Sequence, residues 1–152
     1  MPFEHRIRRR VEFSETDMAG IMHYSNYFKF METAEHDFFR SFGFSIVTRQ
    51  VEPPVGWPRV HAWCDFHAPL HFEDEVEVRL LVAKKRSKSI DYLFRFSSLG
   101  GPEPVETARG GLTVVCVRRA SNGAMKAASI PDSIAVHIEP APGELLFDRR
   151  VH

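Results

Sequence analysis

One segment of this chain, from about Ser25 to Phe42, has the periodicity of an amphipathic helix with a wide apolar arc. At about 100° per residue, its apolar side chains cover about half of the helix circumference. They are Tyr27, Phe28, Phe30, Met31, Ala34, Phe38, Phe39 and Phe42. Ser25 or Asn26 can cap the start, and Gly43 suits the left-handed residue that ends a helix. One flat contact cannot cover so wide an arc along roughly 27 Å of helix, so we expect a curved sheet to cradle it.

Alternating apolar and polar residues predict one strand before this helix and four after it. The apolar positions are Phe3, Ile7, Val11 and Phe13, then Val60, Ala62, Cys64 and Phe66, then Val76, Val78, Leu80 and Val82, then Ile90, Tyr92, Phe94 and Phe96, and residues 112–117 are apolar on both faces. Short charged or glycine-rich links between the later strands indicate an antiparallel meander. The predicted class is α+β, with one long helix on a strongly curved antiparallel sheet of about five strands.

The length and composition limit the class of protein. The 152 residues suit one domain, which we expect to span 1–152, with a short helix near residues 131–137 and an irregular tail from about residue 139. Hydrophobic residues make up 43% of the chain, enough for a buried core. Twenty basic and twenty acidic residues cancel, which argues against a nucleic-acid-binding surface over the whole domain. No apolar run approaches the roughly 20 residues that span a membrane and no signal peptide is evident, so we predict a cytoplasmic protein.

Neither the cysteines nor the histidines suggest a metal site. Cys64 and Cys116 match no metal-ligand spacing, and we expect both to be reduced thiols in the core. His61, His67 and His71 would share one face of a strand but lie roughly 13–20 Å apart, too far to bind one ion. We therefore predict no bound metal.

The segment between the first strand and the helix carries the most specific pattern in the chain. It has the sequence FSETDMAGIMHYSNYFKFME, from Phe13 to Glu32. Together with the turn from His67 to Asp74 and with Pro131, this run resembles the hotdog-fold thioesterases of the 4-hydroxybenzoyl-CoA thioesterase family and its acyl-CoA thioesterase relatives. The resemblance covers roughly residues 5–135 and implies a hotdog fold.

The resemblance also implies a reaction, the hydrolysis of acyl-CoA to a carboxylic acid and CoA without a cofactor. Asp17 would be the nucleophile or general base, the N–H of Tyr24 would polarise the thioester carbonyl, and Gly20 would let the turn approach the substrate. His23 is either a loop or helix-cap residue or a group in the acyl pocket that positions water. From the residues alone, Asp17 could instead be a helix-capping turn residue, Gly20 a plain turn glycine and the Tyr24 side chain a packing group.

A basic turn between two predicted strands is the candidate site for the nucleotide of CoA. Its residues are Lys84, Lys85, Arg86, Ser87 and Lys88, and Arg118 at the end of the last long strand joins them. Cationic and hydroxyl side chains suit the phosphates of CoA, so with the resemblance we predict that this set binds the substrate. The alternative is a solvated hairpin that protects a sheet edge. No aromatic residues interleave these cations, which argues against nucleic acid.

Glu35 is the unexpected residue, because it falls inside the apolar arc of the helix. It could lie at a subunit seam or reach water, or it could be a second carboxylate near the acyl site, while Glu32 is expected to be a structural hydrogen-bond partner. The resemblance implies a homodimer or homotetramer with its sites between subunits. Two rival functions remain open, a hotdog acyl-thioester dehydratase or hydratase that uses His23 and Glu35, and a non-catalytic acyl-CoA-binding subunit.

Overall fold

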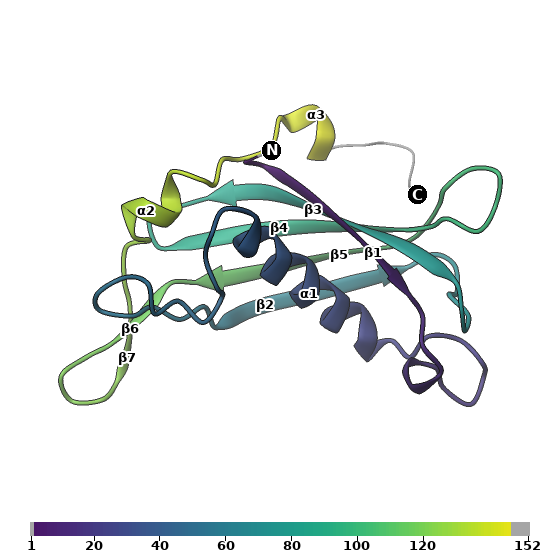
Figure 1. Cartoon of the computed structure of the whole chain (residues 1–152), viewed down its shortest axis with the longest axis horizontal. Helices are drawn as coiled ribbons and strands as arrows, with labels where there is room; N and C mark the ends of the chain where they lie inside the picture. The colour runs from purple at the N-terminus through teal and green to yellow at the C-terminus, as the bar shows by residue number, and fades with distance from the viewer. Residues whose placement is uncertain (1, 147–152) are drawn as a thin grey trace.

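The computed structural model describes residues 2–146, in which one long helix is wrapped by an antiparallel sheet (Figure 1). In chain order the elements are β1 (Glu4–Arg10), the 3-10 turn η1 (Phe13–Glu15), α1 (Ser25–Ser41), β2 (Arg59–Phe66), β3 (Glu75–Lys85), β4 (Ser89–Ser98), β5 (Val105–Val115), β6 (Val117–Arg119), β7 (Met125–Ala127), α2 (Asp132–Ala135) and α3 (Gly143–Leu146). Five strands form one sheet in the order β1-β3-β4-β5-β2, and β6 and β7 form a separate hairpin. The predicted α+β class is confirmed.

The predicted meander is correct for β3, β4 and β5 but wrong for β2. Strand β2 pairs with β5, with Ala62 opposite Leu112, whereas β1 occupies the outer edge of β3, with Ile7 opposite Val78. The chain therefore passes from one edge of the sheet to the other through α1, and it returns through residues 67–74. Alternation could not reveal this, because it reports which face of a strand is buried and not which strand lies beside it.

The core lies between α1 and the concave face of the sheet (Figure 1). The alternating residues of β3 and β4 are buried as predicted, and the largest fully buried side chains of α1 are three Phe and one Met. These are Val76, Val78, Leu80 and Val82 on β3, Ile90, Tyr92, Phe94 and Phe96 on β4, and Phe30, Met31, Phe38 and Phe39 on α1. Apolar side chains at helical spacing thus meet apolar side chains at strand spacing in one cluster.

The two outer predicted strands are less covered than their patterns suggested. Strand β1 ends at Arg10, so Phe13 lies outside it in η1, where its side chain is 77% exposed. On β2, Val60 and Phe66 are 61% and 49% exposed, because β2 is an edge strand that α1 covers only in part. Apolar side chains are therefore left uncovered on this edge.

The start of α1 differs from the prediction. The N-cap residue is Tyr24, not Ser25 or Asn26, and its side chain caps no backbone group. Instead, Nδ1 of His23 accepts the backbone N–H of Ser25 at 3.2 Å, and the Asn26 side chain donates to the carbonyl of Glu15 at 2.8 Å. These two bonds tie the preceding loop to the first turn of the helix.

Two adjacent glycines on β5 allow close packing on both faces of the sheet. A Cβ at Gly110 would lie 2.1 Å from the Met31 Cε of α1, and a Cβ at Gly111 would lie 2.2 Å from the indole nitrogen of Trp63. Only a residue without a Cβ permits such approaches. The helix can therefore sit close to the middle of the sheet.

The C-terminal part is more regular than expected. The predicted helix near residues 131–137 is α2, which follows Pro131. The expected irregular tail contains the short helix α3, and its remainder from residue 147 lies outside the described residues.

Candidate active site

Asp17 lies in a tight turn on the loop that leads from β1 into α1. Its Oδ1 accepts the backbone N–H groups of Ala19 at 2.8 Å and Ile21 at 3.4 Å. Gly20 closes the turn with φ +82°, a left-handed conformation that favours glycine. Within residues 2–146, the second oxygen, Oδ2, accepts no hydrogen bond. The turn therefore fixes the carboxylate through Oδ1 and leaves Oδ2 without a hydrogen-bond partner among the described residues.

Two open hollows meet at Asp17. One, of about 460 Å³, is lined by Asp17, Ile21, Met22, Tyr24, Tyr27, Phe66, His67, Ala68 and Pro69. The other, of about 520 Å³, is lined by Phe13, Thr16, Asp17, Met18, Gly20 and Phe72. We call the first the Tyr27 hollow and the second the Phe72 hollow. The half-buried Asp17 side chain is the residue that borders both.

Tyr24 brings the first turn of α1 to the edge of the Tyr27 hollow. Its backbone N–H precedes the hydrogen-bonded turns of the helix and donates no hydrogen bond to any described residue. Its ring is 64% exposed, so the side chain is not a core packing group. An unpaired N–H at a helix N-terminus, where the helix dipole is positive, suits a developing negative charge.

His23 stands beside this turn but lines neither hollow. Its ring stacks on the ring of Tyr24 with 4.6 Å between centroids, and its Nδ1 lies 2.8 Å from the hydroxyl of Ser25. Its backbone N–H donates to the carbonyl of Glu15 at 2.8 Å. This geometry is that of a residue that secures the helix start.

Most residues of the Tyr27 hollow were not identified as site residues from the sequence, among them Tyr27, Phe66 and His67. Tyr27 was assigned to the core, Phe66 to a buried strand face and His67 to a turn. Phe66 packs edge-on against Tyr27 with 4.9 Å between ring centroids. Burial raises the pKa of Tyr27 to about 12, so its hydroxyl remains protonated at neutral pH. Tyr27 lies within the run from Phe13 to Glu32 that carries the family resemblance, and His67 begins the resembling turn at residues 67–74, but neither resemblance marked them as site residues.

The Phe72 hollow was likewise not foreseen. The rings of Phe13 and Phe72 meet edge to face at 5.9 Å, although these side chains are 77% and 49% exposed. They come from separate segments, the loop after β1 and the loop before β3. Alternation had placed Phe13 in a strand, so it gave no sign of this contact.

The predicted basic turn lies at the other end of the sheet from Asp17. Arg10 of β1 pairs with Glu75 and Glu4 pairs with Leu81, so the loop after β1 adjoins the start of β3 and the turn at 84–88 follows its end. The eleven residues of β3 extend roughly 33 Å. One chain therefore does not bring these cations beside Asp17.

Two members of the basic turn are already engaged within the chain. The ammonium of Lys85 donates to the carbonyls of Ala135 and Ile138 at 2.7 and 2.8 Å. Both terminal nitrogens of Arg86 bond Asp91, at 3.0 and 2.9 Å. The remaining predicted residues, Lys84, Ser87 and Lys88, are exposed, and Arg118 is half-buried.

Residues 11–138 match the sequence pattern of the thioesterase-like superfamily. The chain belongs to this superfamily. The matched range holds every element from η1 to α2, and so includes the turn at Asp17 and the start of α1. The resemblance to thioesterases predicted from the sequence is therefore confirmed at the level of the superfamily.

Individual relatives of this thioesterase-like chain support the same assignment. A putative esterase of Aquifex aeolicus (strain VF5) is 34% identical over 134 residues, which cover 88% of this chain and 95% of that protein. A 1,4-dihydroxy-2-naphthoyl-CoA hydrolase of Synechococcus sp. (strain CC9902) is 35% identical over 80 residues, 49% of this chain and 54% of that relative. This second match spans only about half of either protein.

Solved structures agree with the predicted hotdog fold. A gentisyl-coenzyme A thioesterase has a TM-score of 0.74 at 32% identity, with 88% of this chain and 99% of that chain covered. A 4-hydroxybenzoyl-CoA thioesterase complexed with 4-hydroxybenzoyl-CoA has a TM-score of 0.80 at 21% identity, with 90% and 99% covered. The second likeness concerns the fold alone.

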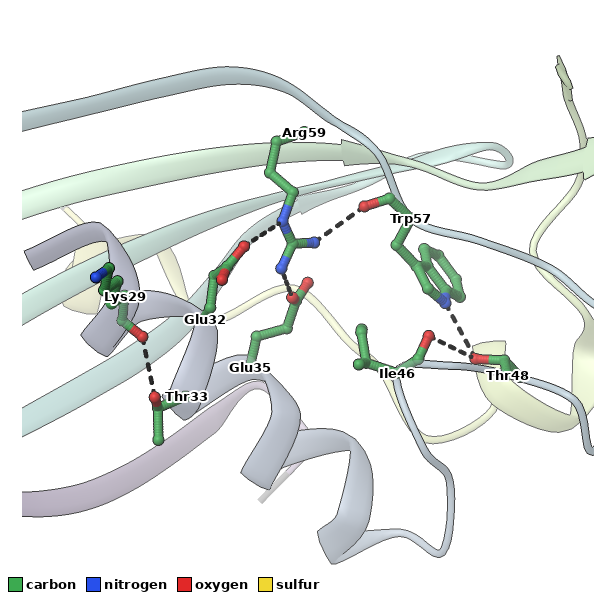
Figure 2. A network of polar contacts seen from close by, with 8 residues as sticks. All are labelled: Lys29, Glu32, Thr33, Glu35, Ile46, Thr48, Trp57 and Arg59. Atoms are coloured by element: carbon green, nitrogen blue, oxygen red, sulfur yellow. Dashed lines mark hydrogen bonds and ion pairs between the residues drawn. The ribbon is translucent and has the colours of Figure 1, made fainter. Parts of the chain in front are cut away.

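Glu35 of this thioesterase-like chain is fully buried and paired with Arg59 in the gap between α1 and β2 (Figure 2). Its Oε1 accepts a hydrogen bond from Nη2 of Arg59 at 2.5 Å. The other two guanidinium nitrogens donate elsewhere, Nε to Glu32 at 3.2 Å and Nη1 to the Trp57 carbonyl at 3.0 Å. The alternative in which Glu35 reaches water is therefore wrong. Glu32 accepts a hydrogen bond from Arg59, in keeping with its predicted role as a structural hydrogen-bond partner. Glu35 lies about 16 Å along the helix from Tyr24 and lines neither hollow.

Burial and the charge of Arg59 shift the pKa of Glu35 in opposite directions. Burial raises the pKa of Glu35, while the positive charge of Arg59 opposes the rise. The fully buried Tyr92 hydroxyl of β4 lies close enough to Glu35 to affect its pKa, although its geometry falls short of a hydrogen bond. Glu35 thus depends on Arg59 for its charged form.

The described part of the chain shows no three His, Cys, Asp or Glu side chains grouped to hold a metal ion. Cys64, which is half-buried, and Cys116, which is buried, form no disulfide in the described part of the chain. Among the helices of residues 2–146, none is both long and apolar enough to cross a membrane.

Proposed function

We propose that this chain hydrolyses an acyl-CoA thioester to a carboxylic acid and free CoA. Thioester hydrolysis is the reaction class of the superfamily to which it belongs. By their names, relatives act on the CoA esters of dihydroxynaphthoic, gentisic and 4-hydroxybenzoic acids, all of which are aromatic. The rings of Tyr24, Tyr27 and Phe66 around the Tyr27 hollow support an aromatic acyl group here as well.

One observation carries the proposal. Asp17, whose Oδ2 accepts no hydrogen bond from the described residues, and Tyr24, whose backbone N–H is unpaired among them, border the same hollow. Thioester hydrolysis needs these two groups, a nucleophile or base for the carbonyl carbon and a donor for the carbonyl oxygen. A turn residue whose only task was to cap backbone groups would need neither the second oxygen nor the adjacent donor.

The chemistry can follow either of two balanced routes. In the first, Asp17 attacks the carbonyl carbon, the C–S bond breaks to release the CoA thiolate, and water hydrolyses the resulting anhydride. In the second, Asp17 takes a proton from a water molecule, whose oxygen attacks the same carbon while the thiolate leaves. In both routes the Tyr24 N–H bonds the carbonyl oxygen as negative charge develops on it, which typically contributes about 3–4 kcal/mol.

A second copy of the chain would complete the site. Strand β2 is a sheet edge that carries the exposed Val60 and Phe66, and such edges pair readily with another strand. Antiparallel pairing of two β2 strands about a two-fold axis brings opposite ends of the two sheets together. We propose that a homodimer or homotetramer forms in this way and that the partner's basic turn approaches Asp17 to bind the nucleotide.

Two measurements test this assembly. Light scattering should give two or four chains per particle, and a folded, active monomer would contradict the arrangement. Reversing the charges of the exposed Lys84 and Lys88 to Glu should raise the KM for acyl-CoA and leave the KM for the matching acyl-pantetheine, which lacks the nucleotide, unchanged. An equal change for both substrates would refute nucleotide binding by the turn.

The experiment that tests the function is thiol release from a panel of acyl-CoA substrates with short, medium, long and aromatic acyl groups. We expect selective release, greatest for the aromatic esters. The panel should include crotonyl-CoA, because addition of water with the thioester intact would indicate a hydratase. Tight binding of CoA esters without any turnover would indicate a non-catalytic binding subunit.

A further inference from the structure

His67 occupies a fixed position at the mouth of the Tyr27 hollow. It follows directly after β2, and its backbone N–H donates to the carbonyl of Thr107 at 2.8 Å. The next residue, Ala68, donates to the same carbonyl at 3.1 Å. Thr107 is itself buried in β5. The sheet therefore anchors the backbone of His67, whatever its side chain does.

The imidazole of His67 has no hydrogen-bond or ion-pair partner among the described residues, unlike the imidazoles of His23 and His71. The residue is exposed, and its ring forms no hydrogen bond or ion pair with any described side chain. By contrast, His23 bonds the hydroxyl of Ser25, and the ring of His71 lies 3.7 Å from Asp74. A polar ring that lines a hollow beside a reactive carboxylate, with no internal partner, is available to a ligand.

The residues around His67 indicate the chemical groups of a ligand that would bind there. Phe66 and Tyr27 form an edge-to-face aromatic pair, which suits the face and edge of another ring. The Tyr27 hydroxyl is protonated at neutral pH, because burial raises its pKa to about 12. Aromatic walls with a few polar groups are typical of sites for substituted aromatic ligands.

We propose that His67 is a specificity-determining residue, whose imidazole hydrogen-bonds a hydroxyl group on the aromatic acyl part of the substrate. The inference rests on the proposed thioesterase function and adds to it the residue that distinguishes hydroxylated from plain aromatic acyl groups. A neutral imidazole carries one donor and one acceptor, and so does a hydroxyl group, so the two are complementary in either tautomer. A site built to bond a hydroxyl also leaves its own polar group unsatisfied when the hydroxyl is missing, which strengthens discrimination.

The test compares kcat/KM for benzoyl-CoA with that for the three monohydroxybenzoyl-CoA isomers. We expect the wild type to prefer one hydroxylated isomer and His67→Ala to lose roughly tenfold on that isomer, about the value of one uncharged hydrogen bond. The same variant should change by less than about threefold on benzoyl-CoA. His67→Gln, which keeps a donor and an acceptor, should restore part of the preference.

His71→Ala is the matched control, because it removes a nearby imidazole that lines neither hollow. It should leave the preference for the hydroxylated isomer unchanged. An equal loss on all substrates in His67→Ala, or no loss, would overturn the role of His67 while the thioesterase function stands. A wild type that releases thiol from no acyl-CoA would overturn the proposed function and this inference with it.

Discussion

Replacing Arg59 with Met should destabilise the folded state, because it leaves the buried carboxylate of Glu35 without its ionic partner. In the wild type, Arg59 lies 2.5 Å from Glu35 and supplies the opposite charge within the gap between α1 and β2. The Met side chain fills similar space but carries no charge. Glu35, which is fully buried, then keeps only the imperfectly placed Tyr92 hydroxyl nearby. The folded state must accommodate either an unpaired charge or a protonated carboxyl group.

The expected loss is large because the Glu35 carboxylate is fully buried, although the Arg59 side chain is 23% exposed. Removing one partner of a buried ion pair typically costs about 3–5 kcal/mol, which for a chain of this size lowers the melting temperature by roughly 6–20 °C. Replacing both partners by apolar side chains of similar volume removes the unpaired charge. The double variant Glu35→Leu/Arg59→Met should therefore lie within about 1 kcal/mol of the wild type, or exceed it.

The loss of stability in Arg59→Met should also increase as the pH rises. Without Arg59, burial raises the pKa of Glu35 further above its ordinary value of 4.5. Between the unfolded and folded pKa values, the folded variant holds a proton that the unfolded chain has released. Its free energy of unfolding therefore falls as pH rises through this window, by up to about 1.4 kcal/mol per pH unit.

Urea denaturation of the wild type and of these variants between pH 5 and pH 8 measures both effects. Arg40→Met is the control, since the Arg40 side chain is 60% exposed and its ion pair with Asp37, at 3.4 Å, should contribute less than about 1 kcal/mol. The reasoning is refuted if Arg59→Met matches the wild type at pH 8, or if the double variant is no more stable than the single one.

Three further predictions follow from single contacts. In Gly110→Ala the new Cβ would meet the Met31 Cε at 2.1 Å, so the free energy of unfolding in urea should fall by about 1–3 kcal/mol. Tyr24→Pro suits the local φ of −56° but lacks the N–H, so kcat should fall about 10²–10³-fold, whereas Tyr24→Ala should keep most of it. A hydrogen bond with His5 lowers the pKa of Asp37, so its stabilisation is present above the ordinary value of 3.8 and disappears as pH falls. Asp37→Asn should therefore lower the melting temperature at pH 6 and progressively less toward pH 3.

The regular elements with one buried face could be predicted, because burial imposes a period on the sequence. Helix α1 and strands β3 and β4 lie where their apolar spacing placed them. The position of β2 beside β5 could not be predicted, since spacing contains no information about which strand is the neighbour. Phe13 matched the alternation by chance and lies beyond the end of β1.

The residues of the candidate site likewise fall into those that could be predicted from the sequence and those that could not. Asp17, Gly20 and Tyr24 lie within one short segment, so their spacing could be recognised in the sequence. Phe66 and His67 approach them only after the sheet has formed, from more than forty residues later in the chain. Local periodicity cannot predict contacts between segments so far apart. For the same reason, the sequence identified the cations of the basic turn but not the internal partners of Lys85 and Arg86.

The most direct test of Asp17 as the reacting carboxylate is the steady-state rate of thiol release by Asp17→Asn on the best substrate of the wild type. Asn keeps an oxygen that can accept the N–H groups of Ala19 and Ile21, so the turn should persist. Glu103→Gln, the same chemical change on an exposed loop, is the control. We predict that kcat falls at least about 10²-fold in Asp17→Asn and is unchanged in the control. Equal rates in wild type and Asp17→Asn would contradict the account.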